Sequence, residues 1–269
     1  MAVGLVSYRM QKYVVLEKSV GETPLLTLEI FRAQHEEFKD VPLSYAGLLD
    51  PMASGKLIIL CGDECKNRSA YDSLDKEYEF EVLFGCTTDT GDVLGIPTMA
   101  EETQRYSKKK LARISNELRS VHTVPYPAFS SKTVNGVPLF EYARKKTLHT
   151  IHVPTLDMRV YGLHCDGVRA VSSAILLEKI LSKIVLLQSG DFRSDEIGRA
   201  WSELLAGQEK QYAIAKFTAV VSSGTYIRTL ASMIAKNVGT DGIAYSIHRS
   251  TIGKYQPLFG GYGFWRKRL

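Results

Sequence analysis

Cysteine and proline are scarce in this chain of 269 residues, which contains 4 cysteines and 9 prolines. The cysteines form no CxxC pair and no cluster with histidine at zinc-binding spacing; they are Cys61, Cys65, Cys86 and Cys165. His149 and His152 come closest to a metal-binding pair, but no carboxylate or thiol ligand neighbours them in the sequence. We therefore expect no metal ion.

Long apolar runs are also missing. The longest, residues 57–61 and 184–187, fall far short of the roughly 20 residues that a membrane-spanning helix needs. The opening segment, residues 1–7, lacks a basic stretch followed by a long apolar run and a cleavage site, which argues against a secretory signal. The sequence thus predicts a cytoplasmic protein without a membrane span.

The composition is that of a folded protein, with 45% hydrophobic and 23% charged residues. No repeat, low-complexity tract or linker rich in glycine, serine or proline divides the chain, so one domain is the default. The 34 Lys and Arg residues exceed the 29 Asp and Glu residues, which gives a net charge of +5. This mild excess permits a polyanionic partner without requiring one.

The first sixty residues predict a strand, a helix, a loop and a second strand. Residues 13–16 are apolar, and Thr23 and Pro24 then supply an N-cap and a first-turn proline for a helix to about Lys39. Residues 41–55 hold two glycines and two prolines without a clear period, which indicates a loop. Residues 56–61 form the next buried strand.

The rest of the chain mixes strands and helices without regular alternation. Residues 76–85 alternate between apolar and acidic side chains, which predicts a strand, and residues 107–119 have helical spacing. Residues 123–147 are rich in lysine, arginine and aromatics, so we expect a long exposed excursion. Near the end, residues 216–221 predict a strand and 225–238 a helix, so the fold class is α+β or mixed α/β.

Three residues could carry chemistry, although each also has an ordinary interpretation. Asp50 precedes Pro51 in the predicted loop, where Asp-Pro commonly starts a turn. Arg228 lies in the first helical turn, where the helix dipole disfavours a cation by up to about 1 kcal/mol, so it either pairs with an anion or is a solvated surface residue. Tyr78 is either a core tyrosine or a ring on which a nucleobase stacks. Separately these features decide nothing.

Taken in order, these segments match the motifs of a known family. Residues 44–55 (SYAGLLDPMASG) match GHTGxLDPxATG, residues 76–78 (KEY) match KxY, and residues 85–92 (GCTTDTGD) match GxxTDTxD. Further matches are residues 18–23 to KPxGxTS, 223–230 to SKGTYIRTL and 247–255 to LRRxxxxxxY. The chain resembles the TruB family of pseudouridine synthases, which convert uridine 55 in the T loop of tRNA to pseudouridine.

The resemblance implies the pseudouridine synthase fold, a mixed and largely antiparallel sheet flanked by helices, with a central catalytic cleft. Asp50 then matches the catalytic aspartate, Tyr78 the ring packed on the target uracil, and Arg228 the residue that fixes the aspartate. The reaction detaches, rotates and rejoins the base without redox chemistry or a group donor, so no cofactor is needed. Whether Asp50 attacks the base or the sugar, or acts as a base, stays open.

The same matches imply where RNA is held. Tyr45 stands where the family usually has a histidine that fills the space of the flipped nucleotide, and Phe129 replaces the usual tyrosine of a thumb-like segment, residues 123–147. Other expected RNA contacts are Lys18, Lys132, Tyr142, Arg144, Ile247 and Arg249. We expect a catalytic domain at residues 1–255 and a short basic tail at 256–269, without the further RNA-binding domain of many relatives. The expected partner is the tRNA T stem-loop, bound by a monomer that needs no protein partner.

Two alternatives stay open. One is a catalytically weak or inactive RNA-binding protein or tRNA chaperone of the same fold, and the other is a synthase that acts on a different RNA. An inactive binding protein would be expected to have lost its aspartate or arginine, whereas Asp50 and Arg228 are both present. The sequence therefore favours an active enzyme.

Overall fold

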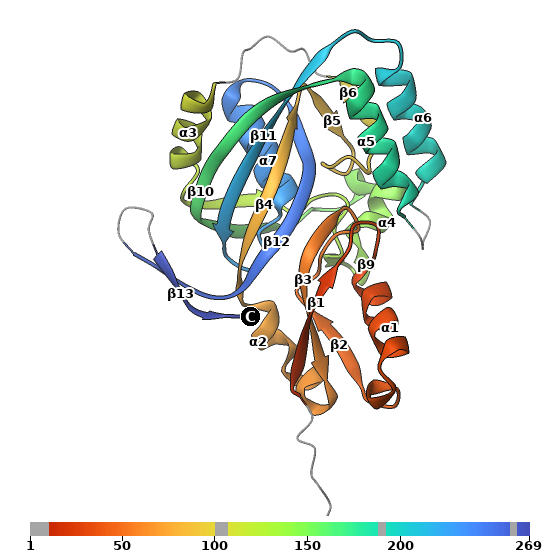
Figure 1. Ribbon diagram of the computed structural model, residues 1–269, viewed down its shortest axis with the longest axis vertical. Coiled ribbons are helices and arrows are strands. Elements are labelled where there is room, and N and C mark those ends of the chain that lie inside the picture. Colours follow the sequence, from red (N-terminus) through yellow and green to blue (C-terminus); the bar gives the residue numbers. More distant parts are fainter. Residues whose placement is uncertain (1–10, 100–106, 188–191, 259–262) are drawn as a thin grey trace, which may run out of the picture.

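The centre of the molecule is a sheet that runs through most of its length (Figure 1). The computed structural model describes residues 11–99, 107–187, 192–258 and 263–269. The strands of the main sheet are β1 (Tyr13–Lys18), β2 (Leu43–Ala46), β3 (Ala53–Cys61), β4 (Asp75–Phe84), β7 (Val121–Pro125), β10 (Thr155–Ser172), β11 (Gln211–Val221), β12 (Gly242–Pro257) and β13 (Gly263–Arg268). Within the described residues the order is β1-β3-β12-β4-β11-β10-β7, with β2 paired to β3 and β13 to β12.

The pairing of these strands confirms the predicted class. Strands β3 and β12 run parallel, and the other pairs of the main sheet are antiparallel. Two small hairpins lie outside it, β5 (Cys86–Thr88) with β6 (Pro97–Met99) and β8 (Thr133–Val134) with β9 (Val137–Pro138). The helices are α1 (Pro24–Gln34), α2 (Arg68–Asp72), α3 (Lys108–Glu117), α4 (Leu139–Arg144), α5 (Ser173–Val185), α6 (Ser194–Leu205) and α7 (Ile227–Val238). The fold is therefore α+β, with a mixed and largely antiparallel sheet.

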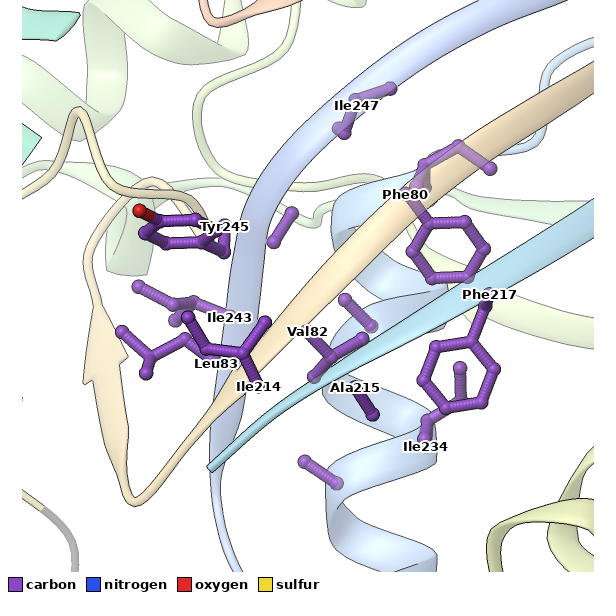
Figure 2. Close-up of a cluster of buried hydrophobic side chains, with 14 of the residues drawn as sticks. Phe80, Val82, Leu83, Ile214, Ala215, Phe217, Ile234, Ile243, Tyr245 and Ile247 are labelled. Atoms are coloured by element: carbon purple, nitrogen blue, oxygen red, sulfur yellow. The ribbon is translucent and has the colours of Figure 1, made fainter. Parts of the chain in front are cut away.

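The main core lies between the central strands and α7. Figure 2 shows Phe80 of β4 beside Phe217 of β11, with Ile234 of α7 close to them. The two phenylalanine rings stack with centroids 5.5 Å apart. Because alternate residues of a strand face the same side, the alternation of β4 buries Tyr78, Phe80 and Val82 on one face, as the sequence predicts.

The predicted helices at 107–119 and 225–238 are confirmed as α3 and α7. The side chain of Ser107 accepts a hydrogen bond from the backbone N–H of Lys110 and caps α3. Gly239 ends α7 at φ +98°, a left-handed conformation that favours glycine. Both boundaries follow from residues next to each other in the sequence, which is why they could be predicted.

Two predictions in the first sixty residues are wrong in part. The helix expected to reach Lys39 ends at Gln34, because His35 takes an extended backbone conformation and a 3-10 turn, Glu36–Phe38, follows. The loop expected at residues 41–55 contains β2 and the start of β3. Strand β2 has four residues and is defined by its pairing with β3, so no periodicity reveals it.

The two segments expected to project from the domain both contribute strands. Part of the 123–147 excursion is β7, which pairs with β10, and the remainder contains β8, β9 and α4. Part of the tail is β13, which pairs with β12. The opening residues 1–7, used above to argue against a signal sequence, lie outside the described residues. No helix among the described residues is long and apolar enough to cross a membrane.

Candidate active site

The loop between β2 and β3 forms one wall of a cleft of about 750 Å³. This loop carries Asp50. The structure brings most of the predicted site residues to the same cleft, which is lined by Asp50, Tyr78, Phe129, Arg144, Arg228, Ile247 and Arg249. The cleft therefore gathers motifs from both ends of the sequence, from Thr23 to Arg249.

Asp50 and Arg228 form an ion pair at the base of this cleft. The Nε atom of Arg228 lies 2.7 Å from Oδ2 of Asp50 and 3.7 Å from Oδ2 of Asp92. The side chain of Arg228 is 4% exposed, whereas that of Asp50 is 38% exposed. The arginine is thus fixed inside the protein, and the aspartate is left open to the cleft.

The guanidinium of Arg228 also joins two further segments. Its Nη1 donates a hydrogen bond to the carbonyl of Thr90 at 2.7 Å, and its Nη2 donates one to the carbonyl of Phe129 at 3.0 Å. One buried side chain therefore connects the Asp50 loop, the turn before β6 and the start of the thumb-like segment. Of the two interpretations of Arg228 in the first turn of α7, the structure thus supports a cation paired with anionic side chains, Asp50 and Asp92.

The carboxylates around Arg228 affect its pKa more than its burial does. Burial by itself would lower the pKa of Arg228, but the carboxylates of Asp50 and Asp92 raise it above its ordinary value. Burial raises the pKa of Asp92, against the opposing charge of Arg228. The guanidinium therefore stays protonated at neutral pH and provides a fixed positive charge beside Asp50.

Asp92 was not among the predicted site residues. Its Oδ1 accepts hydrogen bonds from the hydroxyl of Thr90 at 2.8 Å and the backbone N–H of Leu94 at 2.9 Å. These bonds hold the buried carboxylate beside Arg228 at the wall of the cleft, which Asp92 also lines. The available signal was its place as the last residue of the matched 85–92 motif.

Arg249 lies under the Asp50 loop. Its guanidinium donates to the carbonyls of Gly47 at 2.8 Å, Leu48 at 3.2 Å and Lys56 at 2.7 Å. The residue is 1% exposed. Three of its N–H groups thus bond to the backbone of the loop and of β3, a geometry that favours a supporting role, while its expected contact with RNA stays a prediction. Its position is that of a residue that holds the loop in place.

Lys18 is likewise buried, which favours a supporting role, and its expected contact with RNA stays a prediction. Its ammonium donates to the carbonyls of Ser19 and Glu22, both at 2.8 Å, and burial lowers its pKa to about 8. These bonds close a turn whose Gly21 N–H donates to the carbonyl of Pro51 at 2.8 Å. Gly21 has φ +91°, and a Cβ atom there would lie 2.2 Å from the carbonyl oxygen of Leu186. The turn therefore requires glycine and supports the Asp50 loop from outside.

Tyr78 and Ile247 lie on adjacent strands that cross the cleft floor. Tyr78 is buried in β4, directly opposite Arg249 of β12. Ile247 precedes Arg249 by two residues, and its side chain is buried as well. The ring and the aliphatic side chain give the cleft an apolar surface within the same pocket as the exposed carboxylate of Asp50.

Tyr45 does not line the cleft. It packs beside the buried side chains of Leu28, Leu57 and Ile59, and the guanidinium of Arg68 lies 5.4 Å from its ring centroid. Arg68 does line the cleft. Tyr45 is thus a half-buried residue that packs against the core and against Arg68, and its expected place beside a flipped nucleotide stays a prediction.

The thumb-like segment divides into residues that reach the cleft and residues that do not. Phe129 and Arg144 line it. Lys132 lies 5.3 Å from the ring centroid of Tyr126, and the hydroxyl of Tyr142 donates to the carbonyl of Val134 at 3.3 Å. Neither Lys132 nor Tyr142 lines the cleft, so any contact they make with RNA lies outside it.

Arg193 is a cleft residue that the sequence analysis missed. Its guanidinium lies 5.1 Å from the ring centroid of Phe129 and 2.8 Å from a carboxylate oxygen of Asp89. Its backbone has φ +55°, in the left-handed region. No motif or periodicity marks this position, because its contacts are with residues distant in sequence.

The described residues contain no group of three or more histidine, cysteine, aspartate or glutamate side chains placed to hold a metal ion. What the cleft offers instead is one open carboxylate, one fixed guanidinium and an aromatic floor. Such a set suits a reaction in which a carboxylate attacks a carbon atom as a nucleophile or removes a proton as a base.

Comparison with known proteins decides the family. Residues 36–179, more than half of the chain, match the family described as TruB family pseudouridylate synthase (N terminal domain). The chain belongs to this family. The motifs of the TruB family identified in the sequence thus agree with a match over a long continuous region.

Relatives in the TruB family are similar over most of this chain. The tRNA pseudouridine synthase B of Aquifex aeolicus is 27% identical over 89% of the chain and 67% of its own length. The corresponding protein of Hydrogenovibrio crunogenus is 29% identical over 89% of the chain and 64% of its own length. The tRNA pseudouridine synthase 4 of Saccharomyces cerevisiae is 27% identical over 74% of the chain and 57% of its own length. The chain thus spans about two thirds of the length of these relatives, or less.

A solved structure supports the fold. A chain in the crystal structure of a Cbf5-Nop10-Gar1 complex superposes with a TM-score of 0.53 and 14% sequence identity. The match covers 90% of this chain and 48% of that chain. At this identity the likeness shows a shared fold.

Proposed function

We propose that this protein isomerises uridine to pseudouridine in tRNA, at uridine 55 of the T loop, with Asp50 as the catalytic carboxylate. The observation that carries the proposal is the Asp50 carboxylate, held 2.7 Å from the buried guanidinium of Arg228 and open to a cleft that Tyr78 lines. Membership of the TruB family and the names of its relatives support the reaction and the tRNA substrate.

The proposed chemistry needs only what these side chains supply. The N-glycosidic bond of uridine breaks, the uracil rotates, and a C-glycosidic bond forms, so substrate and product contain the same atoms. Asp50 acts as a nucleophile on the base or the sugar, or as a base that takes a sugar proton, and each role needs an ionised and oriented carboxylate. A guanidinium at ion-pair distance supports both requirements. Tyr78 provides a ring against which the displaced uracil packs.

The direct test is to map pseudouridine in a tRNA transcript after incubation with the purified protein. We expect one new pseudouridine, at uridine 55, and none in a transcript with cytidine at that position. RNA binding without any pseudouridine would favour the non-catalytic RNA-binding protein. Pseudouridine at another site, in tRNA or in total RNA from cells, would favour a synthase with a different substrate.

We also propose that the protein acts as a cytoplasmic monomer with a catalytic domain at residues 1–255. One copy of the chain supplies Asp50, Tyr78 and Arg228 to the cleft, so the proposed chemistry needs no residue from a second copy. Sedimentation at the protein concentrations used for the activity assay measures the state directly, and a dimer that dissociates together with loss of activity would contradict it.

Replacement of Arg249 by lysine is expected to lower kcat by roughly 10- to 100-fold, the range found when a residue that orients a reactive group is lost. Lysine keeps the charge but cannot donate to the three carbonyls that Arg249 reaches. The KM for RNA is expected to change less than about threefold, because the side chain is buried. Steady-state kinetics separate the two parameters, with the exposed Arg113→Lys as control. A raised KM with an unchanged kcat would instead indicate that Arg249 contacts the RNA.

Replacement of Tyr45 by alanine is expected to lower the free energy of unfolding by roughly 1–2 kcal/mol, because it removes the packing of a half-buried ring against Leu28, Leu57 and Ile59. Tyr45→Phe keeps the ring and serves as the matched control, with an expected loss below about 1 kcal/mol. Urea denaturation measures both variants. A large loss of RNA affinity in either variant at unchanged stability would place Tyr45 at the RNA instead.

A further inference from the structure

The last two strands form a ribbon that leads away from the cleft. Ile247 and Arg249 of β12 line the cleft, and β12 continues to Pro257, where β13 returns beside it (Figure 1). At about 3.3 Å per residue, Lys254 lies roughly 20 Å along β12 from Ile247. We call residues 253–257 and 263–268 the C-terminal ribbon.

A bulge decides which side chains of the ribbon share a face. Lys254 lies opposite Lys267, but the next pair is Tyr255 with Trp265, so Arg266 is an extra residue on β13. Directly opposite residues share a face, and successive residues of a strand alternate. The bulge therefore places Trp265 with Tyr255 on one face and Lys267 with Lys254 on the other.

The aromatic face packs on the body of the protein. The rings of Tyr255 and Trp265 meet edge to face with centroids 5.2 Å apart, and Tyr255 lies 5.5 Å from Tyr161 of β10. Asp75 of β4 accepts hydrogen bonds from the backbone N–H of Tyr255 and the hydroxyl of Tyr161. These contacts fix the ribbon to the main sheet and turn its other face outward.

The outward face contains Lys254, Gln256, Phe264 and Lys267, and the exposed bulge residue Arg266 lies between Trp265 and Lys267 on the same strand. The three cations are exposed, and Phe264 is 51% exposed. None of the three cations forms an ion pair with a carboxylate among the described residues. Like charges directly opposite each other on a sheet, as in the Lys254 and Lys267 pair, destabilise it by a few tenths of a kcal/mol to about 1 kcal/mol. An anion bound across the pair would remove this cost.

We propose that the outward face of the C-terminal ribbon binds the phosphate backbone of the RNA stem that continues from the loop held in the cleft. The inference rests on the proposed function. Cationic side chains on neighbouring strands lie about 5 Å apart, which suits successive phosphates of a nucleic-acid strand. A protein partner would need an apolar centre, whereas Phe264 is the single apolar side chain of this face.

The geometry sets a minimum length for the RNA. A stem of about five base pairs extends roughly 15 Å and ends before Lys254 if it runs along β12, whereas about twelve base pairs pass beyond the ribbon. The ribbon thus extends the RNA contact past the T stem-loop expected from the sequence alone. Recognition here is by backbone and shape, as is usual for double-stranded RNA.

The test compares two hairpins with the same loop, one with a stem of about five and one with a stem of about twelve base pairs. The ribbon variant combines Lys254→Gln, Arg266→Gln and Lys267→Gln. Its control combines Lys39→Gln, Lys66→Gln and Lys179→Gln, which removes the same charge from exposed lysines that each pair with a carboxylate. Fluorescence anisotropy at several salt concentrations gives Kd for each protein with each hairpin.

We expect the ribbon variant to bind the long hairpin about tenfold more weakly, with a salt slope reduced by about two, and to bind the short hairpin within about twofold of the unmodified protein. The control variant should bind each of the two hairpins with a Kd within about twofold of that of the unmodified protein. Equal losses on both hairpins, an equal loss in the control, or no loss at all would overturn the proposal. Because anisotropy needs no turnover, a protein that makes no pseudouridine would contradict the proposed function and leave this measurement decisive for the ribbon.

Discussion

Asp50→Asn is expected to abolish pseudouridine formation, with kcat lowered by at least about 10⁴-fold, a loss typical of removing the central group of a catalytic set. The amide is neutral, so it neither attacks carbon nor takes a proton at neutral pH. The Kd for substrate RNA is expected to change less than about threefold, because phosphate contacts and stacking elsewhere carry most of the affinity. Single-turnover kinetics with tRNA and a parallel binding titration measure both quantities.

The control for this variant is Asp63→Asn, at an exposed carboxylate that pairs with Lys66 on the surface. It should retain full activity. Both proteins should keep their structure, since Arg228 retains Asp92 as a counter-ion and its hydrogen bonds to two carbonyls. Turnover by folded Asp50→Asn within tenfold of the unmodified protein would remove Asp50 from the proposed mechanism.

Much of the fold could be predicted because its signals are local. The alternation along β4 reports which side chains face the core, since a strand has a period of two. Ser107 and Gly239 mark the ends of α3 and α7 through hydrogen bonds and backbone geometry within one turn. These features depend on residues that adjoin each other in the sequence.

The failures have the opposite origin. Strand β2 exists because β3 pairs with it, and β13, expected as part of a basic tail, exists because β12 does. Lys18 and Arg249 show only their charge in the sequence, and a cation in a matched motif of an RNA-modifying family suggests a phosphate contact. In the fold both are buried, with Lys18 bonded to the carbonyls of its own turn and Arg249 to carbonyls of the Asp50 loop, and no local pattern in the sequence predicts either contact.

The candidate site shows the same division. The motifs identified Asp50, Tyr78 and Arg228, and the cleft brings all three together. The second counter-ion, Asp92, and the stacking of Arg193 on Phe129 depend on how loops meet. A motif therefore indicated which residues to examine, and the distances show which of them face the cleft and which support it.

Arg228→Lys is expected to lower kcat by about 10³-fold although it keeps a positive charge, the size of loss seen when one fixed charge or donor is removed from a catalytic site. Arg228 reaches Asp50, Asp92 and the carbonyls of Thr90 and Phe129 at once. One ammonium cannot span these positions, so Asp50 loses its fixed orientation. Steady-state kinetics with tRNA measure the loss, and Arg199→Lys on α6 is the control. A kcat for Arg228→Lys within tenfold of that of the unmodified protein would mean that a positive charge beside Asp50 is enough for activity.

Arg228→Gln tests whether Arg228 is the counter-ion of buried Asp92, through the pH dependence of stability. It leaves Asp92 buried without its cation, so we expect a loss of roughly 3–5 kcal/mol in the free energy of unfolding at neutral pH. Burial already raises the pKa of Asp92, and removing Arg228 takes away the charge that opposes this rise. A carboxyl group whose pKa is raised on folding binds its proton more readily in the folded state, so the stability it contributes increases as pH falls through that pKa. Urea denaturation should therefore show a smaller deficit relative to the unmodified protein at about pH 5 than at about pH 8. An equal deficit at both pH values would show that Asp92 does not need Arg228 as its counter-ion, and the two-carboxylate arrangement of the site would then have to be abandoned.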